Sequence, residues 1–245
     1  MKTRLFFSIL CLVFATTSVA APSADLLLKD SDRSRGGNLK GITWDIEIKT
    51  EDDGEVNTRD FSVKAKGVDA LVEATSPARN KGEIFLFNDR AMWFLKPGLR
   101  KPVSISARQK LSGQAANGDI ASTNYVGDYD GKITKTEKID GVDTYVLELK
   151  AKAKNVTYDQ IRYWINSTSH LGVKAEFLTL QGMILKRATF EYNNHINHEG
   201  QSIPFVSKMN IIDAKFSKNK SAITYMNPKE EAHPASLFNI NNVNR

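Results

Sequence analysis

Two histidines and a glutamate lie close together in the sequence and have the residue types and spacing of a metal site. His195 and His198 are three positions apart in "NNHINHEG", and Glu199 follows directly. Two imidazoles and a carboxylate are ligands that zinc or copper accepts. The flanking asparagines and Gly200, however, are typical of a polar hairpin loop between two strands. We therefore expect a loop here and no metal ion.

Other catalytic patterns are not recognisable in the sequence. It contains no Gly-x-Ser-x-Gly elbow, no phosphate-binding glycine loop and no dinucleotide fingerprint. His170 stands in a predicted turn and His233 near the end of the chain, where we expect both to be solvated. Cys11 is the only cysteine, so the rest of the chain has no thiol nucleophile and no disulfide. We expect no enzymatic activity and no cofactor.

The first twenty residues have the composition of a signal peptide. Lys2 and Arg4 precede a short apolar run, which ends in the small residues Ser18, Val19 and Ala20. We expect export and cleavage after Ala20. Cleavage lowers the net charge of +6 by two, and the remaining charges are interspersed along the chain. This pattern does not indicate a nucleic-acid surface, although peripheral contact with an anionic membrane remains open.

From residue 39 onward the sequence alternates in the manner of successive β-strands. Ile42, Trp44, Ile46 and Ile48 alternate with polar residues, so this strand should have one buried face and one wet face. With two further strands before Pro77, we predict about thirteen strands in all. The later predicted strands span residues 82–88, 91–96, 101–107, 130–139, 143–151, 160–166, 172–181, 183–193, 203–213 and 220–226.

Three segments interrupt this strand pattern. Residues 23–35 have helix signals, with Ser23 as an N-cap and an apolar patch after it. Residues 108–129 lose the strand period, and so long an interruption is usually functional or disordered. Residues 227–245 form a C-terminal tail. We expect residues 21–245 to form a single domain.

Two consecutive predicted strands are apolar on both faces. In "MWFL", Met92 and Phe94 would point one way, whereas Trp93 and Leu95 would point the other; "EIFLF" at 83–87 behaves alike. Such strands are favourable when one face lies inside a curved sheet and another element covers the other face. A strongly bent sheet crossed by a helix satisfies this, and so does a two-sheet sandwich. The bent sheet would form an unclosed barrel, and of the two arrangements only this one would hold an apolar cavity for an acyl chain.

The run from Ser76 to Asp128 contains a distinctive order of motifs. Pro77 precedes a glycine-led apolar strand at 82–87, "MWFLKP", a basic strand with "VSIS", and a Gly/Asp-rich stretch before Tyr125. Because of this order of motifs, the sequence resembles the LolA-like outer-membrane lipoprotein-sorting protein family. The segment Trp93 to Pro97 is its most specific part. Flanking segments such as "DSDRSRGG" also fit, so the resemblance covers roughly residues 25–225.

The resemblance implies both a fold and a function. The expected fold is mainly β with few helices: a strongly curved antiparallel sheet forming an unclosed β-barrel, covered by lid helices. Residues 23–35 and the segment 108–129, here called the lid segment, would be that cover. The implied function is a monomeric periplasmic carrier of lipid or of lipoprotein acyl chains. Some family members look like partners of RND-type (MMPL-like) inner-membrane exporters, and an outer-membrane acceptor is the other expected partner.

Candidate binding residues follow from the apolar strands. Each aromatic side chain, taken singly, is more readily explained by a filled core, but one of the two faces of these strands should line a cavity if one exists. The candidate cavity residues are Trp44, Ile46, Phe85, Met92, Trp93, Phe94, Phe177 and Phe190. Lys96, Arg100 and Lys101 are candidates for a cavity rim that contacts lipid headgroups.

Two other functions remain open at the level of sequence. A sensor or adaptor of the same fold would bind a protein partner and would have a filled cavity. A hydrolase or metal-dependent enzyme would depend on His195 and His198.

Overall fold

The structure is a computed structural model that describes residues 21–89, 91–121 and 123–243. The predicted signal peptide, residues 1–20, lies outside the described residues, so its cleavage stays a prediction. No helix in the described ranges is long and apolar enough to cross a membrane. The helical elements are α1 (Ala24–Arg33), η1 (Ala78–Asn80), η2 (Asn117–Ile120), α2 (Tyr125–Asp128), η3 (Ala235–Phe238) and α3 (Ile240–Val243).

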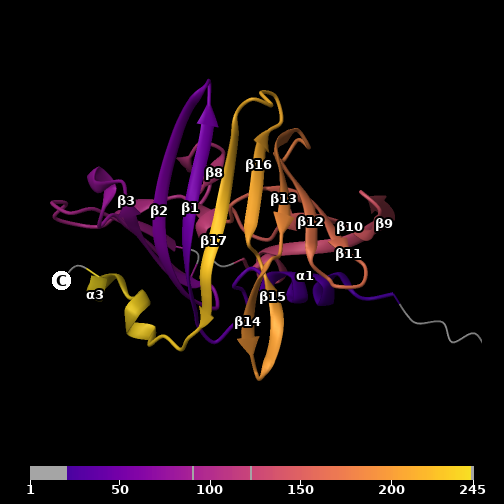
Figure 1. The fold of residues 1–245 in the computed structure, drawn as a ribbon, viewed down its shortest axis with the longest axis horizontal. Coiled ribbons are helices and arrows are strands. Elements are labelled where there is room, and N and C mark those ends of the chain that lie inside the picture. Colours follow the sequence, from indigo (N-terminus) through magenta and orange to yellow (C-terminus); the bar gives the residue numbers. More distant parts are fainter. Residues whose placement is uncertain (1–20, 90, 122, 244–245) are drawn as a thin grey trace, which may run out of the picture.

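The described chain is mainly β (Figure 1). The strands of the first half are β1 (Ile42–Asp52), β2 (Glu55–Lys66), β3 (Asp69–Ser76), β4 (Ile84–Asn88), β5 (Ala91–Leu95), β6 (Val103–Ile105), β7 (Lys110–Ser112) and β8 (Ala115–Ala116). Those of the second half are β9 (Tyr129–Ile139), β10 (Val142–Ala151), β11 (Gln160–Asn166), β12 (Gly172–Leu178), β13 (Ile184–Glu191), β14 (Asn194–His198), β15 (Gln201–Phe205), β16 (Lys208–Asp213) and β17 (Lys220–Glu230).

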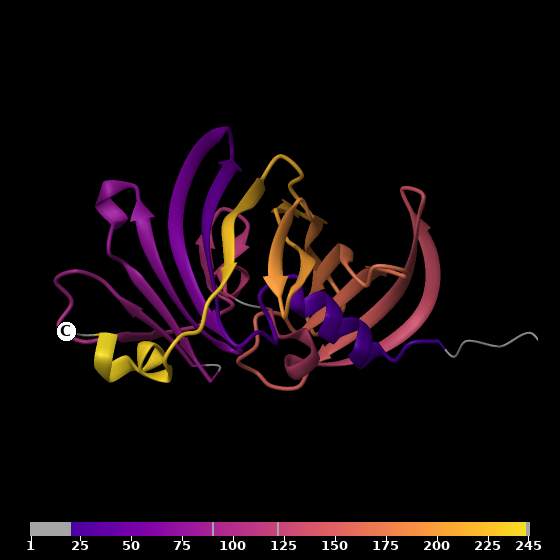
Figure 2. The same ribbon diagram turned by 60° about the horizontal axis from the view of Figure 1, so that its bottom comes forward.

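One curved sheet organises the molecule. Its 13 strands follow the order β6-β5-β4-β3-β2-β1-β17-β16-β13-β12-β11-β10-β9, and β14-β15 and β7-β8 form two small separate hairpins. The sheet curls into a trough whose edge strands β6 and β9 stay apart, while α1 and the lid segment lie inside the curve (Figure 2). The predicted fold, a strongly curved and unclosed antiparallel barrel with few helices, is confirmed.

Alternation of apolar and polar residues explains how each strand is oriented. In β1 the side chains of Ile42, Trp44, Ile46 and Ile48 are buried, and the polar residues between them are more exposed. Ile46 pairs with Phe61 of β2 on one side and with Tyr225 of β17 on the other. We call the surface that carries these buried side chains the inner face, and the opposite surface the outer face.

The doubly apolar strand β5 has a different core on each side. Met92 and Phe94 belong to the large inner core, whereas Trp93 and Leu95 pack on the outer face. The C-terminal cover, which we define as residues 235–243, supplies the outer partners, and its Phe238 is completely buried. The cover contacts β3 and β4, and its packing on Leu86 and Leu95 explains why β4 and β5 need no polar face.

The C-terminal half departs from the predicted strands in three places. The predicted strand 203–213 is two strands, because the chain leaves the β14-β15 hairpin at Val206 and Ser207 before it joins the main sheet. The predicted loop around His195 is strand β14 of that hairpin. β17 continues past residue 226 through a register shift opposite Trp44, where the bulge accommodates Pro228.

The prediction that His170 and His233 are solvated is wrong. The His170 ring is 2.8 Å from the Asp30 carboxylate of α1, and only a quarter of its side chain is exposed. His233 is buried, and its Nε2 lies 3.1 Å from Thr43 Oγ1. His170 therefore links α1 to the turn between β11 and β12, and His233 links the segment after β17 to β1.

Candidate functional site

The lid segment fills much of the trough and is held to the sheet by polar contacts. Arg59 Nη1 donates to the carbonyl of Leu111 at 3.4 Å, and the Gln114 amide donates to Ser221 Oγ at 2.8 Å. The described residues of the lid segment form the separate β7-β8 hairpin and contribute no strand to the main sheet before β9. Side-chain contacts therefore provide much of its attachment, together with backbone hydrogen bonds from the Thr123 amide to the Arg35 carbonyl and from the Lys152 amide to the Asp128 carbonyl.

A buried ion pair is the central attachment of the lid segment. Lys186 Nζ, on β13, lies 3.0 Å from Asp119 Oδ2 and donates to the Gln114 carbonyl at 2.7 Å. Tyr158 OH donates to the same carboxylate at 2.7 and 2.8 Å. Burial, followed by the charge of Asp119, raises the pKa of Tyr158, so this phenol keeps its proton. One carboxylate of the lid thus accepts bonds from two residues of the sheet side.

The approach of β1 and β17 to the lid segment depends on a glycine. Gly113 has a positive φ of 52°, and a Cβ there would lie 2.4 Å from Ser221 Oγ and 2.6 Å from a methyl group of Thr50. Thr50 and Ser221 are both buried in the sheet. Only a residue without a side chain allows the β7-β8 turn to reach this depth.

The other end of the lid segment meets α1. Asp32 Oδ2 accepts from the Val126 amide at 2.9 Å. Burial raises the pKa of Asp32 to about 7, against the opposing influence of the backbone donors of Val126 and Tyr125 and of Arg35. The buried Arg35 guanidinium stacks over the rings of Tyr125 and Phe190 at 5.2 and 4.6 Å.

Open pockets remain on both sides of the lid segment. One, of about 500 Å³, lies between β4, β5 and β7, and Phe85, Phe94, Ile105 and Leu111 form its apolar wall. A second, of about 380 Å³, lies beside Lys186 and extends to the β1-β2 and β16-β17 turns. These volumes fall in the range of small-molecule sites, roughly 300–1,000 Å³.

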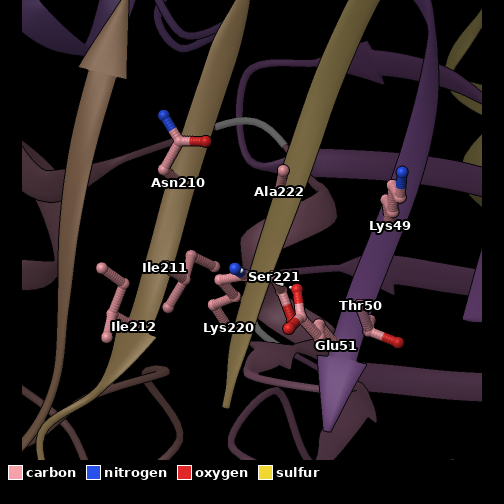
Figure 3. A pocket seen from close by; sticks show the side chains of 9 residues that line it. All are labelled: Lys49, Thr50, Glu51, Asn210, Ile211, Ile212, Lys220, Ser221 and Ala222. Atoms are coloured by element: carbon pink, nitrogen blue, oxygen red, sulfur yellow. Dashed lines mark ion pairs between the residues drawn. The ribbon is translucent and has the colours of Figure 1, made fainter. Parts of the chain in front are cut away.

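A further pocket, of about 460 Å³, lies along β1, β17 and β16 (Figure 3). The small side chain of Ala222 pairs with Lys49 on one side and with Asn210 on the other, and this leaves a hollow between the longer side chains. At its end the Lys220 ammonium lies 2.9 Å from the Glu51 carboxylate. Charged side chains form part of this wall, as Arg59, Glu83 and Lys110 do in the pocket beside Phe85.

The predicted cavity residues fall on two different faces. Trp93 lies in the outer core under the C-terminal cover, so a ligand in the trough would not contact it. Phe85 and Phe94 reach the pocket between β4, β5 and β7. The seven candidates that belong to the inner core are Trp44, Ile46, Phe85, Met92, Phe94, Phe177 and Phe190.

The predicted rim residues are solvent-exposed but are not equivalent. Lys96 Nζ lies 3.4 Å from Glu83 Oε1, and Arg59 Nη2 lies 2.9 Å from Glu83 Oε2. Lys96 therefore belongs to an ion-pair cluster next to the pocket of Phe85. Arg100 and Lys101 stand exposed in the turn after β5.

The histidine pair does not converge on one site. His198 Nδ1 lies 2.9 Å from Glu230 Oε2, whereas His195 takes part in a different pair of the β14-β15 hairpin, opposite Pro204. Among the described residues, no group of three or more His, Cys, Asp or Glu side chains is placed to hold a metal ion.

Sequence reasoning missed the polar centre formed by Asp119, Tyr158 and Lys186. These three residues lie in separate segments, and no local motif links them. The one available signal was Lys186 at a buried position of the alternating strand β13. A lysine whose side chain points toward the core needs an anionic partner. Which residue is that partner could be identified only from the folded structure.

Comparisons with known proteins agree with this architecture. A LolA superfamily protein from Nitrosomonas europaea is 32% identical, with a TM-score of 0.80, over 89% of this chain and 98% of its own. An outer membrane lipoprotein-sorting protein domain from Vibrio parahaemolyticus gives a TM-score of 0.74 at 21% identity, over 91% of this chain and all of its own. A DUF1329 family protein from Desulfovibrio piger gives 0.73 at 20% identity, over 88% and 95% of the two chains.

Sequence comparison adds one family model and no curated relative. The model, described as "Uncharacterized protein", matches residues 66–245, and the chain belongs to that family. No curated protein matches the chain. The resemblance carried by "MWFLKP" and its flanking strands is confirmed by the Nitrosomonas structure. With that identity over most of both chains, the protein belongs to the LolA superfamily.

Proposed function

We propose that the protein is an exported, periplasmic carrier that binds a lipid or the acyl chain of a lipoprotein in its trough. The observation that carries this proposal is the way in which the lid segment covers the inner face. Apolar strands such as β4 and β5 are covered by a segment that is held mainly by side-chain contacts. When the lid segment moves aside, Phe85 and Phe94 become the floor of a longer apolar groove.

The energetics of such a carrier need no covalent step. Each methylene moved from water into the groove contributes about 0.8 kcal/mol, so a long acyl chain offsets the loss of several lid contacts. The direction of transfer then follows from the relative affinities of donor, carrier and acceptor. An outer-membrane acceptor or an RND-type exporter would be the partner, and the carrier would act as a monomer.

The test is whether the purified protein contains or takes up lipid. Organic extraction followed by mass spectrometry should recover co-purified lipid, and a fluorescent acyl probe should bind with a rise in emission. The variant Phe85→Asp places a charge in the groove and should weaken probe binding, whereas Leu180→Asp should not, because 68% of Leu180 is exposed. Lipid-free protein that also fails to take up the probe would rule the carrier out.

A further inference from the structure

We infer that the pocket beside Lys186 binds the anionic headgroup of the carried amphiphile, with a carboxylate or phosphate oxygen taking the place of the Asp119 carboxylate. This inference rests on the proposed function and adds the chemical class of the ligand. It predicts that the carrier prefers acidic amphiphiles to neutral ones of the same chain length.

The argument begins with what holds Lys186 in the closed structure. Its side chain is 9% exposed, and its two polar partners are the Asp119 carboxylate at 3.0 Å and the Gln114 carbonyl at 2.7 Å. Both partners belong to the lid segment. A movement of the lid that opens the groove therefore removes the only polar contacts that the structure records for this ammonium within the described residues.

The neighbours that stay behind are aromatic rings. Lys186 Nζ lies 4.8 Å from the ring centre of Tyr158 and 5.5 Å from that of Phe177, and these two rings are stacked on each other. Ring faces attract a cation, but they do not neutralise its charge. An ammonium left without a counter-charge in a mostly buried place is strongly unfavourable. Lid opening is therefore favoured when the ligand brings a negative charge.

Tyr158 supplies a second donor at the same point. Its hydroxyl donates to both oxygens of Asp119 in the closed structure and is freed together with Lys186 when the lid moves. An ammonium and a phenol that converge on one carboxylate can bind an oxyanion in its place. The pocket of about 380 Å³ adjoins both residues.

The acidic groups near this pocket are already engaged. Asp52 lies 3.2 Å from Lys110 Nζ, and Asp213 accepts from the backbone amides of Lys215 and Phe216. Arg108 pairs with Asp159. Arg108 and Lys110 belong to the lid segment, so these two pairs are released together with the Lys186–Asp119 contact when the lid moves, whereas Asp213 keeps its backbone partners.

The experiment compares parinaric acid with methyl parinarate, which have the same fluorescent chain and differ in the charge of the head. Binding is measured by fluorescence with the purified protein at pH 8. We expect the acid to bind at least about tenfold more tightly, since hydrogen bonds to charged groups contribute roughly 1.5–3 kcal/mol. Acetate and inorganic phosphate at millimolar concentration should not displace it, because the site is proposed for an amphiphile and not for a free anion.

The decisive variant removes both charges of the closed pair. In Asp119→Asn/Lys186→Met no buried charge is left unpaired, so the fold should persist, and the acid and the ester should bind equally well. The matched control is Lys174→Met. Lys174 also lies near a carboxylate, Glu176, and over a ring, that of Trp164, but on the outer face. The control should keep the preference for the acid.

The outcomes separate this inference from the proposed function. Equal binding of acid and ester by the unaltered protein would refute the headgroup site and leave the carrier intact. Persistence of the preference in the double variant, or displacement by free phosphate, would refute it as well. If neither probe binds, the carrier itself is contradicted, and the headgroup site with it.

Discussion

Lys186 of β13 and Asp119 of the lid segment form a buried ion pair at 3.0 Å, although 67 positions separate them in the chain. The pair joins the inner face of the sheet to the segment that covers it. Because both side chains are almost fully buried, removing either charge leaves the other unpaired in the interior, which is strongly unfavourable.

A double-mutant cycle should reveal this coupling. Lys186→Met or Asp119→Asn alone should lower the free energy of unfolding by about 3 kcal/mol, since each leaves a buried charge without its partner. The double variant should lose clearly less than the sum of the two. Urea denaturation followed by tryptophan fluorescence measures all four proteins. Additive losses would show that the two residues act independently.

Gly113→Ala should loosen the lid segment. The new methyl group would collide with Thr50 and Ser221 on two central strands, so the β7-β8 turn must withdraw. We expect faster proteolysis within residues 108–121 and no large change in the circular dichroism of the sheet. Gly67→Ala is the control, because Gly67 has a similar φ of +60° and no atom within 4 Å of its added Cβ. Equal proteolysis of the two variants would contradict the prediction.

Asp32 should make stability depend on pH in an unusual direction. Its pKa is raised by burial from 3.8 to about 7, so the folded protein binds this proton more tightly than the unfolded chain. Its contribution is fully present below pH 4 and is lost as the pH rises to about 7. The free energy of unfolding of the unaltered protein, relative to Asp32→Asn, should therefore fall by a few kcal/mol between pH 4 and pH 7 and then stay level. The control is Asp25→Asn on the same helix, which keeps Asp32 and should therefore keep the pH dependence of the unaltered protein.

Phe238→Ala tests the C-terminal cover. Phe238 is fully buried against the outer core of Leu86 and Leu95, and its truncation should lower the free energy of unfolding by about 3 kcal/mol. Phe216→Ala should change it by less than about 0.5 kcal/mol, because 57% of Phe216 is exposed. Chemical denaturation compares the two. Similar values would mean that the cover contributes little.

Periodicity in the sequence was enough to predict most of the sheet. The alternation of Ile42, Trp44, Ile46 and Ile48 correctly predicted the buried face of β1, and the two apolar phases of "MWFL" predicted a cover on each side. Strand β14 was not predicted, because its asparagines are typical of loops. The true end of β17 was not predicted either, because Asn227 and Pro228 disfavour a strand unless a bulge accommodates them.

The candidate site was harder to predict because its residues meet only through the fold. Asp119 lies in a stretch without a regular period, and Tyr158 lies in the loop before β11. Nothing local indicated that both would meet Lys186. The face of each aromatic residue could not be assigned either, since Trp93 and Phe94 are equally apolar. Their environments differ only because the C-terminal cover lies on one side and the lid segment on the other.

The position of β17 has a consequence for how the protein is made. This strand joins β1 to β16 at the middle of the sheet, yet it is the last strand that the described residues form. Until residues 220–230 have been synthesised and docked, two half-sheets expose bare edges that can pair with other chains. A nascent chain would therefore depend on protection from aggregation until β17 is available. For the same reason, a truncation that removes residue 220 and all residues after it would separate the trough into two halves.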